Sequence, residues 1–151
     1  EYRYSIWNAP IRSPLACRFA CHYPRPLDVS LMNGACSHLV GARDFRSFGS
    51  APVEGGSTVR TLYSAQCARD GHFIHVRLVA NAFLRHMVRR IVGELLQVGS
   101  GELSPDDFGE ILAAQDPGLI KVKAPAKGLC LIKVNYDAAA EGRPCSVGDD
   151  L

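Results

Sequence analysis

A run of basic residues stands out in the middle of the sequence, because the segment from Arg77 to Arg90 holds four Arg, one His and no acid. In a helix, Arg90 can pair at the surface with Glu94, four residues further on. Arg89 has no carboxylate within reach on its own helix and lies at the flank of the apolar face. A partly buried guanidinium without a partner is costly, and it normally lies against a carboxylate or phosphate. The pattern therefore indicates a functional role for Arg89, as the partner of an anion from outside its helix.

Two Tyr near the start of the chain are the next candidates. In a strand, Tyr2 and Tyr4 point to one face and Arg3 points to the other. Core packing is the ordinary role of such a pair. A platform that stacks on a flipped base is the functional alternative. The residues alone leave both interpretations open.

Metal chemistry has weaker support in the sequence. Cys17, Cys21 and His22 form the tightest cluster of soft ligands, but this C-x3-C-H spacing has no second half elsewhere. We therefore expect no bound metal and reduced thiols, and we keep a Cys/His metal protein as a third, weaker hypothesis. The sequence also contains no Gly-rich phosphate loop, no G-x-S-x-G motif and no paired carboxylates.

The composition limits the possible classes of protein. The 151 residues are enough for one globular core rather than two. Because 17 basic side chains nearly balance 15 acidic ones, any surface for nucleic acid must be local. The longest apolar stretch, Phe83 to Val98, is interrupted by charged side chains and cannot cross a membrane. The first residue, Glu1, directly precedes a predicted strand, so we expect the sequence to be a fragment.

The elements that must position these residues follow from apolar periodicity and turn signals, which predict an α+β fold with helices on one face of a sheet. The predicted strands are Tyr2–Trp7, a short Arg18–Tyr23, Val59–Arg69, His72–Ala80 and Leu129–Tyr136, with a hairpin turn at Asp70-Gly71. The predicted helices are one capped by Asp28 and stopped at Gly41, one over Leu84–Val98, and one from Ser104-Pro105 to near Asp116. A surface loop is predicted over Gly49–Ser57, and a frayed tail over Ala138–Leu151.

Several motifs in the same order resemble the A-type tRNA pseudouridine synthases. The longest runs from Asn81 through Arg89-Arg90-Ile91-Val92-Gly93 to Gly101. The others are Glu1-Tyr2-Arg3-Tyr4, Gly41 to Phe48, Val59-Arg60-Thr61-Leu62, and Ala124-Pro125-Ala126-Lys127-Gly128-Leu129. Together they extend from Tyr2 to Tyr136, nearly the whole chain. The resemblance implies a ferredoxin-like α/β plait, in which residues 1–137 form the C-terminal subdomain of the catalytic domain and residues 138–151 form a tail that we expect to be disordered.

This resemblance also implies a reaction. The family converts uridine to pseudouridine on the 3′ side of the tRNA anticodon stem-loop, without metal or cofactor, as a cytoplasmic homodimer. An Asp carboxylate acts on a flipped uridine so that the base detaches, rotates and rejoins through C5. Arg89 matches the residue that pairs with this Asp, Tyr2 matches the residue that stacks on the target base, and Leu129 matches an apolar residue near the pocket.

The family's Asp lies in an Arg-Thr-Asp-Ala-Gly motif of the N-terminal half, and no segment of this sequence matches it. Asp44 does not substitute, because it belongs to a different matched segment. The chain alone is therefore expected to be inactive. We expect RNA contacts from the basic residues Arg85, His86 and Arg90. The alternative from another class is a stand-alone RNA-binding plait without catalysis.

Overall fold

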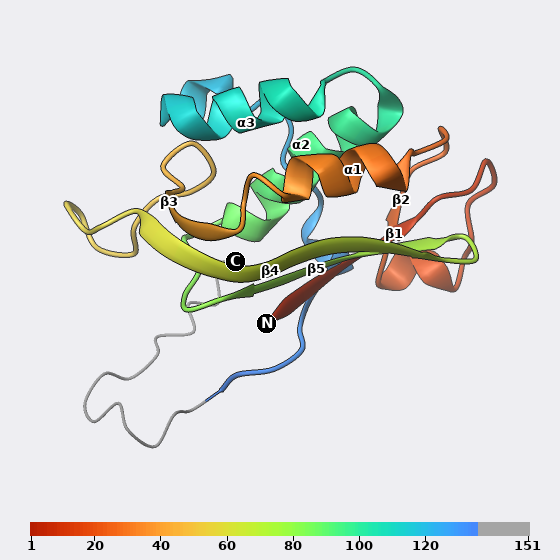
Figure 1. The fold of residues 1–151 in the computed structure, drawn as a ribbon. Helices are drawn as coiled ribbons and strands as arrows, with labels where there is room; N and C mark the ends of the chain where they lie inside the picture. The colour runs from red at the N-terminus through yellow and green to blue at the C-terminus, as the bar shows by residue number, and fades with distance from the viewer. Residues whose placement is uncertain (136–151) are drawn as a thin grey trace.

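The computed structural model describes residues 1–135 and shows an open sheet with the three α-helices on one face (Figure 1). The strands are β1 (Tyr2–Trp7), β2 (Cys21–His22), β3 (Gly41–Asp44), β4 (Val59–Asp70), β5 (Phe73–Ala80) and β6 (Leu129–Leu131). The helices are α1 (Val29–Cys36), α2 (Met87–Ser100) and α3 (Pro105–Ala114), with short 3-10 turns η1 (Ala16–Arg18), η2 (Pro117–Leu119) and η3 (Ala126–Gly128). The α+β class is confirmed.

The sheet has the strand order of a ferredoxin-like plait. The chain runs β1-α1-β4-β5-α2-β6, and β1 pairs antiparallel with both β6 and β5, while β5 pairs with β4. The spatial order is therefore β6-β1-β5-β4, with β3 added beside β4. The short β2 runs parallel to the end of β1. This topology places β1, which carries Tyr2 and Tyr4, in the middle of the sheet and beside β6.

Local signals set several of these boundaries. The Asp28 carboxylate accepts hydrogen bonds from the backbone of Ser30 and Leu31 at the start of α1. The Ser104 hydroxyl accepts one from the Asp107 backbone at the start of α3. The hairpin is confirmed, but its register differs from the prediction because Asp70 pairs with Phe73, which leaves Gly71-His72 as the two-residue turn. Gly71 has a φ of 59°, which is the backbone that this first turn position requires.

Other predicted boundaries are wrong. The main helix α2 begins at Met87 rather than Leu84 and continues through Gly99 to Ser100, where Gly101 in the left-handed region ends it. The first helix ends at Cys36, well before Gly41. The strand β3 was not predicted. The last strand covers only Leu129–Leu131, and residues 132–135 are described but are not in a strand. Tyr136, residue 137 and the predicted tail lie outside the described residues.

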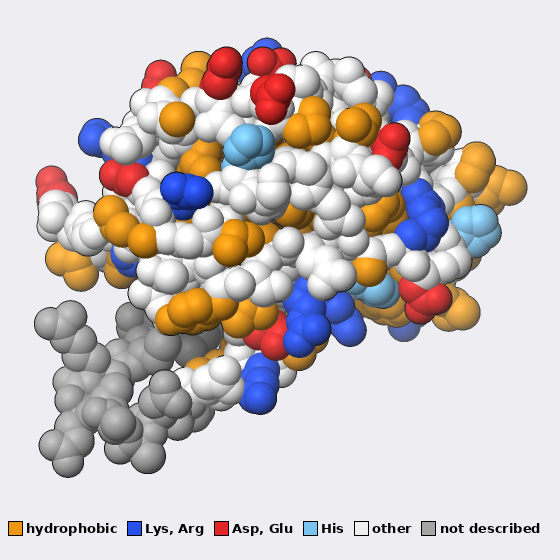
Figure 2. All heavy atoms as spheres, in the orientation of Figure 1, with side chains coloured by type: hydrophobic (Ala, Val, Ile, Leu, Met, Phe, Trp, Pro, Cys, Tyr) orange, Lys and Arg blue, Asp and Glu red, His pale blue; other side chains and the backbone are white. Residues whose placement is uncertain are grey.

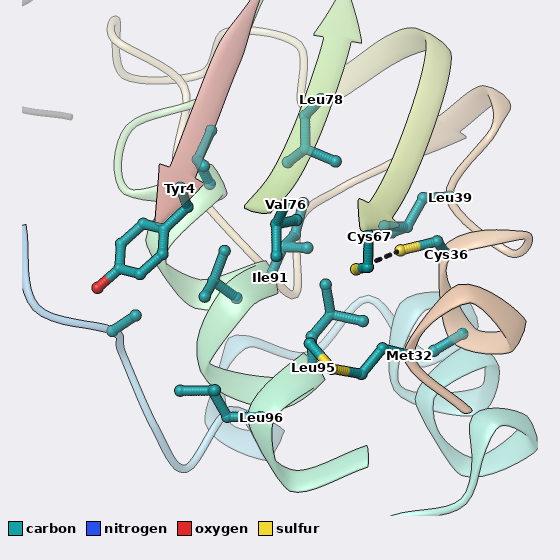
Figure 3. Packing of buried hydrophobic residues seen from close by; sticks show 14 of the residues in the cluster. Tyr4, Met32, Cys36, Leu39, Cys67, Val76, Leu78, Ile91, Leu95 and Leu96 are labelled. Atoms are coloured by element: carbon teal, nitrogen blue, oxygen red, sulfur yellow. Dashed lines mark hydrogen bonds between the residues drawn. The ribbon is translucent and has the colours of Figure 1, made fainter. Parts of the chain in front are cut away.

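The core lies between the sheet and the helices, where Tyr4, Val76 and Leu78 of the sheet face Ile91 and Leu95 of α2 (Figure 3). The thiols of Cys36 on α1 and Cys67 on β4 lie 3.7 Å apart and are both buried. The five Cys of the described chain are free thiols. No helix in residues 1–135 is long and apolar enough to cross a membrane.

Within residues 1–135, the opposite face of the sheet carries no α-helix, and the 3-10 turn η1 lies beside it (Figure 1). There the Phe73 ring stacks between Phe19 and His75, and Trp7 meets Phe73 edge-on. Three large apolar side chains of the loop after β1 are more than half exposed, namely Ile11, Leu15 and Phe19. Apolar side chains also protrude at the right of Figure 2, where Figure 1 places the loop after β1.

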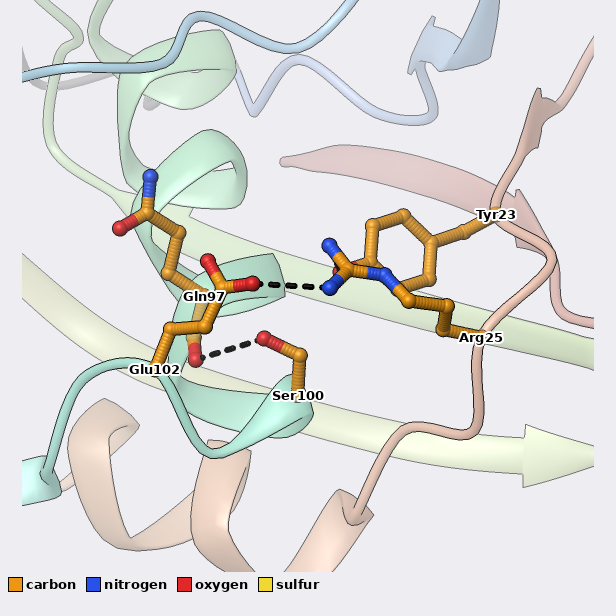
Figure 4. A network of polar contacts seen from close by, with 5 residues as sticks. All are labelled: Tyr23, Arg25, Gln97, Ser100 and Glu102. Carbon is orange, nitrogen blue, oxygen red and sulfur yellow. Dashed lines mark hydrogen bonds and ion pairs between the residues drawn. The ribbon is translucent and has the colours of Figure 1, made fainter.

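Surface interactions tie the C-terminal end of α2 to the loop before α1 (Figure 4). The Arg25 guanidinium lies over the Tyr23 ring and pairs with the Glu102 carboxylate at 2.9 Å. The Ser100 hydroxyl donates to the Gln97 carbonyl. Because Arg25 and Glu102 are exposed, this ion pair adds little to stability.

Candidate active site at the start of α2

Helix α2 begins in a way that does not favour a helix. Its N-cap, His86, has a φ of 62° in the left-handed region, and its side chain makes no capping hydrogen bond. The first turn contains no acid. Instead Arg89 and Arg90 lie in that turn and Arg85 directly precedes the N-cap, although the helix dipole already makes this end positive. Such an end favours an anion.

The positive charges converge on His86. Burial lowers the pKa of His86, and the charges of Lys123, Arg90, Arg85 and Arg89 lower it further. Its Nδ1 is buried and has no hydrogen-bond partner within residues 1–135. Because Lys123 comes from the segment before β6, two distant parts of the sequence build one cationic surface.

Arg89 is half-buried and held by a backbone carbonyl. Its Nε donates to the Ala124 carbonyl at 2.8 Å, and the Ala124 N–H donates to the Arg89 carbonyl at 3.0 Å. The ion pairs within residues 1–135 are Arg25–Glu102 and Arg77–Glu1, so no described acid pairs with Arg89. The two terminal NH₂ groups of the guanidinium can therefore receive a carboxylate in the paired geometry that Arg favours.

The predicted surface pair between Arg90 and Glu94 is wrong. Glu94 is only 2 % exposed, and its Oε1 accepts hydrogen bonds from the backbone N–H groups of Lys121 at 2.9 Å and Val122 at 3.4 Å. The Glu94 carboxylate therefore binds backbone N–H groups of a distant segment instead of the Arg90 side chain. The four-residue spacing could not reveal this competitor.

Tyr2 and Leu129 lie on neighbouring strands beside this helix. Tyr2 is 8 % exposed and belongs to the core cluster, and its ring meets the Phe83 ring edge-on at 4.9 Å. Leu129 is half-buried opposite Tyr4 in the β1–β6 register. The Tyr4 hydroxyl donates to the Pro125 carbonyl at 2.5 Å. The segment 124–129 thus connects Arg89 to β1. It contacts the face of β1 on which both Tyr2 and Tyr4 lie.

Burial raises the pKa of the Tyr4 phenol, Cys21 raises it further, and the nearby charge of Arg89 opposes this shift. Tyr4 is therefore an uncharged hydrogen-bond donor at neutral pH. Its role is to anchor the segment that reaches Arg89, which suits the ordinary core interpretation of a strand aromatic.

The thiols and His of the weaker metal hypothesis make backbone contacts instead. Cys17 donates to the Pro14 carbonyl, Cys21 donates to the His22 carbonyl, and the His22 ring bonds the Ala9 carbonyl. Within the described part of the chain, no group of three or more His, Cys, Asp or Glu could hold a metal ion.

Three parts of this arrangement were not identified from the sequence as parts of a site: Glu94, Lys123 and the Ala124 carbonyl. A signal for the packing exists in Gly93, because a Cβ there would lie 2.2 Å from the Val122 carbonyl oxygen. A glycine on the face of a helix indicates that another backbone passes close to it, but it does not say which one.

Comparisons with known proteins decide the family. The sequence model described as "tRNA pseudouridine synthase" matches residues 35–137. The chain belongs to this family. It is 41% identical over 135 residues to tRNA pseudouridine synthase A of Syntrophotalea carbinolica, covering 89% of this chain and 54% of the relative.

Two further tRNA pseudouridine synthase A proteins give the same result. The Roseiflexus sp. (strain RS-1) protein is 42% identical over 146 residues, covering 94% of this chain and 53% of the relative. The Burkholderia cenocepacia protein is 40% identical over 147 residues, covering 97% of this chain and 54% of the relative. The chain thus spans about half the length of the curated relatives it matches, and its sequence resemblance to the family is confirmed.

Proposed function

We propose that this chain is the C-terminal half of the catalytic domain of a tRNA pseudouridine synthase, which converts uridine to pseudouridine in the anticodon stem-loop of tRNA. The observation that carries the proposal is Arg89, whose guanidinium is half-buried, oriented by the Ala124 carbonyl and unpaired with any described acid. The names of the relatives, tRNA pseudouridine synthase A, support the reaction class. The domain spans residues 1–137, of which 136 and 137 lie outside the described part.

In this proposal the other half of the protein supplies an Asp carboxylate, and Arg89 pairs with it. The bond between N1 of the base and C1′ of the ribose breaks, the base rotates, and a bond between C5 and C1′ forms. The C5 hydrogen leaves as a proton and N1 takes up a proton, so that product and substrate have the same composition. The reaction is an isomerisation and needs no oxidant, metal or cofactor. The guanidinium keeps the carboxylate charged and fixed in position as the bonds change.

The other predicted residues have roles in binding. Tyr2 stacks on the flipped base, and Leu129 lines the apolar side of the pocket. Arg85, His86 and Arg90 contact phosphates, which fits their position at the positive end of α2. The Tyr2 ring packs edge-on against the Phe83 ring at 4.9 Å, which holds its orientation.

The full-length protein is further proposed to be a cytoplasmic homodimer. Ile11, Leu15 and Phe19 support association with another folded unit, because they expose large apolar side chains from one loop beside the sheet face that carries no α-helix within residues 1–135. Light scattering of the full-length protein tests this part, with a monomer as the contradicting result.

The test of the catalytic proposal is Arg89→Ala in the full-length protein, measured by tritium release from tRNA labelled at C5 of uridine. We expect kcat to fall on the order of 10²–10³-fold, with a smaller change in tRNA affinity, because an interaction with the reacting carboxylate is lost. Arg43→Ala is the matched control, since the Arg43 Nε also donates to a backbone carbonyl but lies on the exposed β3. Normal tritium release by the Arg89 variant would contradict the proposal.

The second candidate function is a stand-alone RNA-binding plait. The cationic surface around His86 favours RNA binding whether or not catalysis occurs. A full-length protein that binds tRNA but releases no tritium, and whose other half contains no Arg-Thr-Asp motif, would establish this alternative.

A further inference from the structure

Glu94 is a charged residue in the middle of α2 that the proposed reaction does not use. It is 2 % exposed, and a buried carboxylate is costly unless hydrogen bonds satisfy it. Its Oε1 accepts from the N–H groups of Lys121 and Val122, which are 27 and 28 residues further along the chain. The carboxylate therefore fastens a distant extended segment to the side of the helix.

Two further contacts continue this attachment toward the start of α2. The backbone of Val122 passes so close to Gly93 that a Cβ at position 93 would lie 2.2 Å from its carbonyl oxygen. One helical turn earlier, Ala124 exchanges hydrogen bonds with Arg89 in both directions. As the segment advances from Lys121 to Ala124, it thus passes Glu94, Gly93 and Arg89 in that order.

The last of these contacts sets the orientation of the guanidinium. With Nε committed to the Ala124 carbonyl, the two NH₂ groups of Arg89 keep a fixed direction and remain available for a carboxylate. The position of that carbonyl depends on the attachment two and three residues earlier, at Val122 and Lys121. Pro125, the next residue, is fixed to β1 by the Tyr4 hydroxyl.

We infer that Glu94 is a positioning residue, which holds the segment 121–124 on α2 so that the Ala124 carbonyl aims Arg89 at its anionic partner. This inference rests on the proposed function of Arg89. Glu94 itself touches neither the substrate nor the reacting carboxylate.

The test compares Glu94→Ala and Glu94→Gln in the full-length protein, again by tritium release. We expect Glu94→Ala to lower kcat on the order of 10-fold with KM changed less, because a displacement of about 1 Å at a catalytic group can cost up to on the order of 10²-fold. Glu94→Gln keeps an oxygen acceptor at the same place and should recover most of the turnover.

The matched control is Leu95→Ala, the next residue of the same helix, which is fully buried in the core rather than bonded to the segment. It should lower the melting temperature and leave kcat unchanged at temperatures well below the transition. Equal losses of kcat in Leu95→Ala and Glu94→Ala would overturn the inference, because the effect would then be general destabilisation.

Two more variants separate the possible failures. Gly93→Ala leaves Glu94 intact but forces Val122 away, so it should reproduce the loss of kcat even if Glu94→Ala does not fold. In the Arg89→Ala background, Glu94→Ala should cause no additional loss. If Arg89→Ala lowers kcat while Glu94→Ala and Gly93→Ala do not, the inference fails and the proposed function stands. If Arg89→Ala has no effect, both fail.

Discussion

The starts of α2 and α3 use the same kind of element in opposite ways. At α3, the Ser104 hydroxyl caps the Asp107 backbone, Pro105 occupies the first turn, and Asp106 and Asp107 place negative charge at the positive end of the dipole. At α2, a left-handed His86 without a capping hydrogen bond is followed by Arg89 and Arg90. The first start follows each rule for stabilising a helix, and the second follows none of them.

We interpret the less stable start of α2 as part of the proposed anion-binding site. The missing capping bond and the adverse charge at α2 each cost about 0.5–1 kcal/mol on their own. An anion bound at this end would satisfy the unpaired backbone donors and the cations together. We interpret the α2 start as an anion-binding end that is incomplete without its ligand, whereas the α3 start is complete by itself.

Among the effects that separate the two helix starts, the largest is expected on tRNA binding by the α2 start. We expect affinity to fall on the order of 10²-fold between about 50 and 200 mM salt, if the cations around His86 contact about four phosphates. Replacing both Arg85 and Arg90 by Gln should reduce the slope of log K against log salt by about 2. Filter binding or fluorescence anisotropy at several salt concentrations measures both.

The control for that measurement is Arg25→Gln, at the other end of α2, where Arg25 is exposed and paired with Glu102 (Figure 4). Its slope should equal that of the unchanged protein. A flat salt response, or an equal loss of slope in the control, would contradict a phosphate-binding surface at the α2 start.

The next effect is on folding stability and should have opposite signs at the two starts. Ser104→Ala removes a cap and should lower the free energy of unfolding by about 1 kcal/mol without changing tRNA affinity. His86→Gly relieves a left-handed side chain and should raise that free energy by about 0.5 kcal/mol while weakening tRNA binding. Chemical denaturation and binding assays on the same preparations measure the free energy of unfolding and the tRNA affinity. If His86→Gly lowered the free energy of unfolding and left tRNA affinity unchanged, the proposed difference between the α2 and α3 starts would be contradicted.

The smallest effect is a pH dependence from His86. In the folded chain the pKa of His86 is lower than its ordinary value of 6.5. As the pH falls below 6.5, His86 is therefore protonated in the unfolded chain before it is protonated in the folded chain, and the free energy of unfolding decreases. A bound phosphate offsets the surrounding cations and raises this pKa. tRNA affinity should therefore increase as the pH falls from about 7.5 to 5.5.

The matched variant is His86→Asn, which keeps a residue that tolerates the left-handed region but cannot take up a proton. The rise in affinity at low pH should be smaller in this variant. His75 provides a second comparison, because its pKa is also lowered but it lies on the opposite face of the sheet. Burial is the main cause of that lowering, and the charge of Arg3 is the next. An identical pH profile in His86→Asn would exclude His86 as the titrating group.

How far the sequence could predict the fold depends on whether the deciding contact is local. The caps at Asp28 and Ser104 and the presence of the hairpin were predicted correctly, because their signals lie within a few residues of each other. The turn itself is Gly71-His72 rather than Asp70-Gly71. The start of α2 was misplaced because Leu84 continues the apolar periodicity while the backbone at His86 is not helical. Strand β3 was missed because its four residues become a strand only by pairing with β4.

The same distinction applies to the site. The absence of an acid for Arg89 on its own helix could be seen from spacing, and the structure is consistent with it. The Ala124 carbonyl and the Lys121 and Val122 donors could not be foreseen, because they come from a segment about 30 residues away that has no periodic pattern. The pair Arg90–Glu94 failed for this reason, since a spacing rule counts only partners on the same helix.

The most direct test of the account is a crystal structure of the full-length protein. We expect an Asp carboxylate from the other half to lie within about 3 Å of the Arg89 NH₂ groups. Arg89 Nε should still donate to the Ala124 carbonyl. An Arg89 guanidinium directed into bulk water, or paired with an acid remote from any pocket that could hold a uridine, would contradict it.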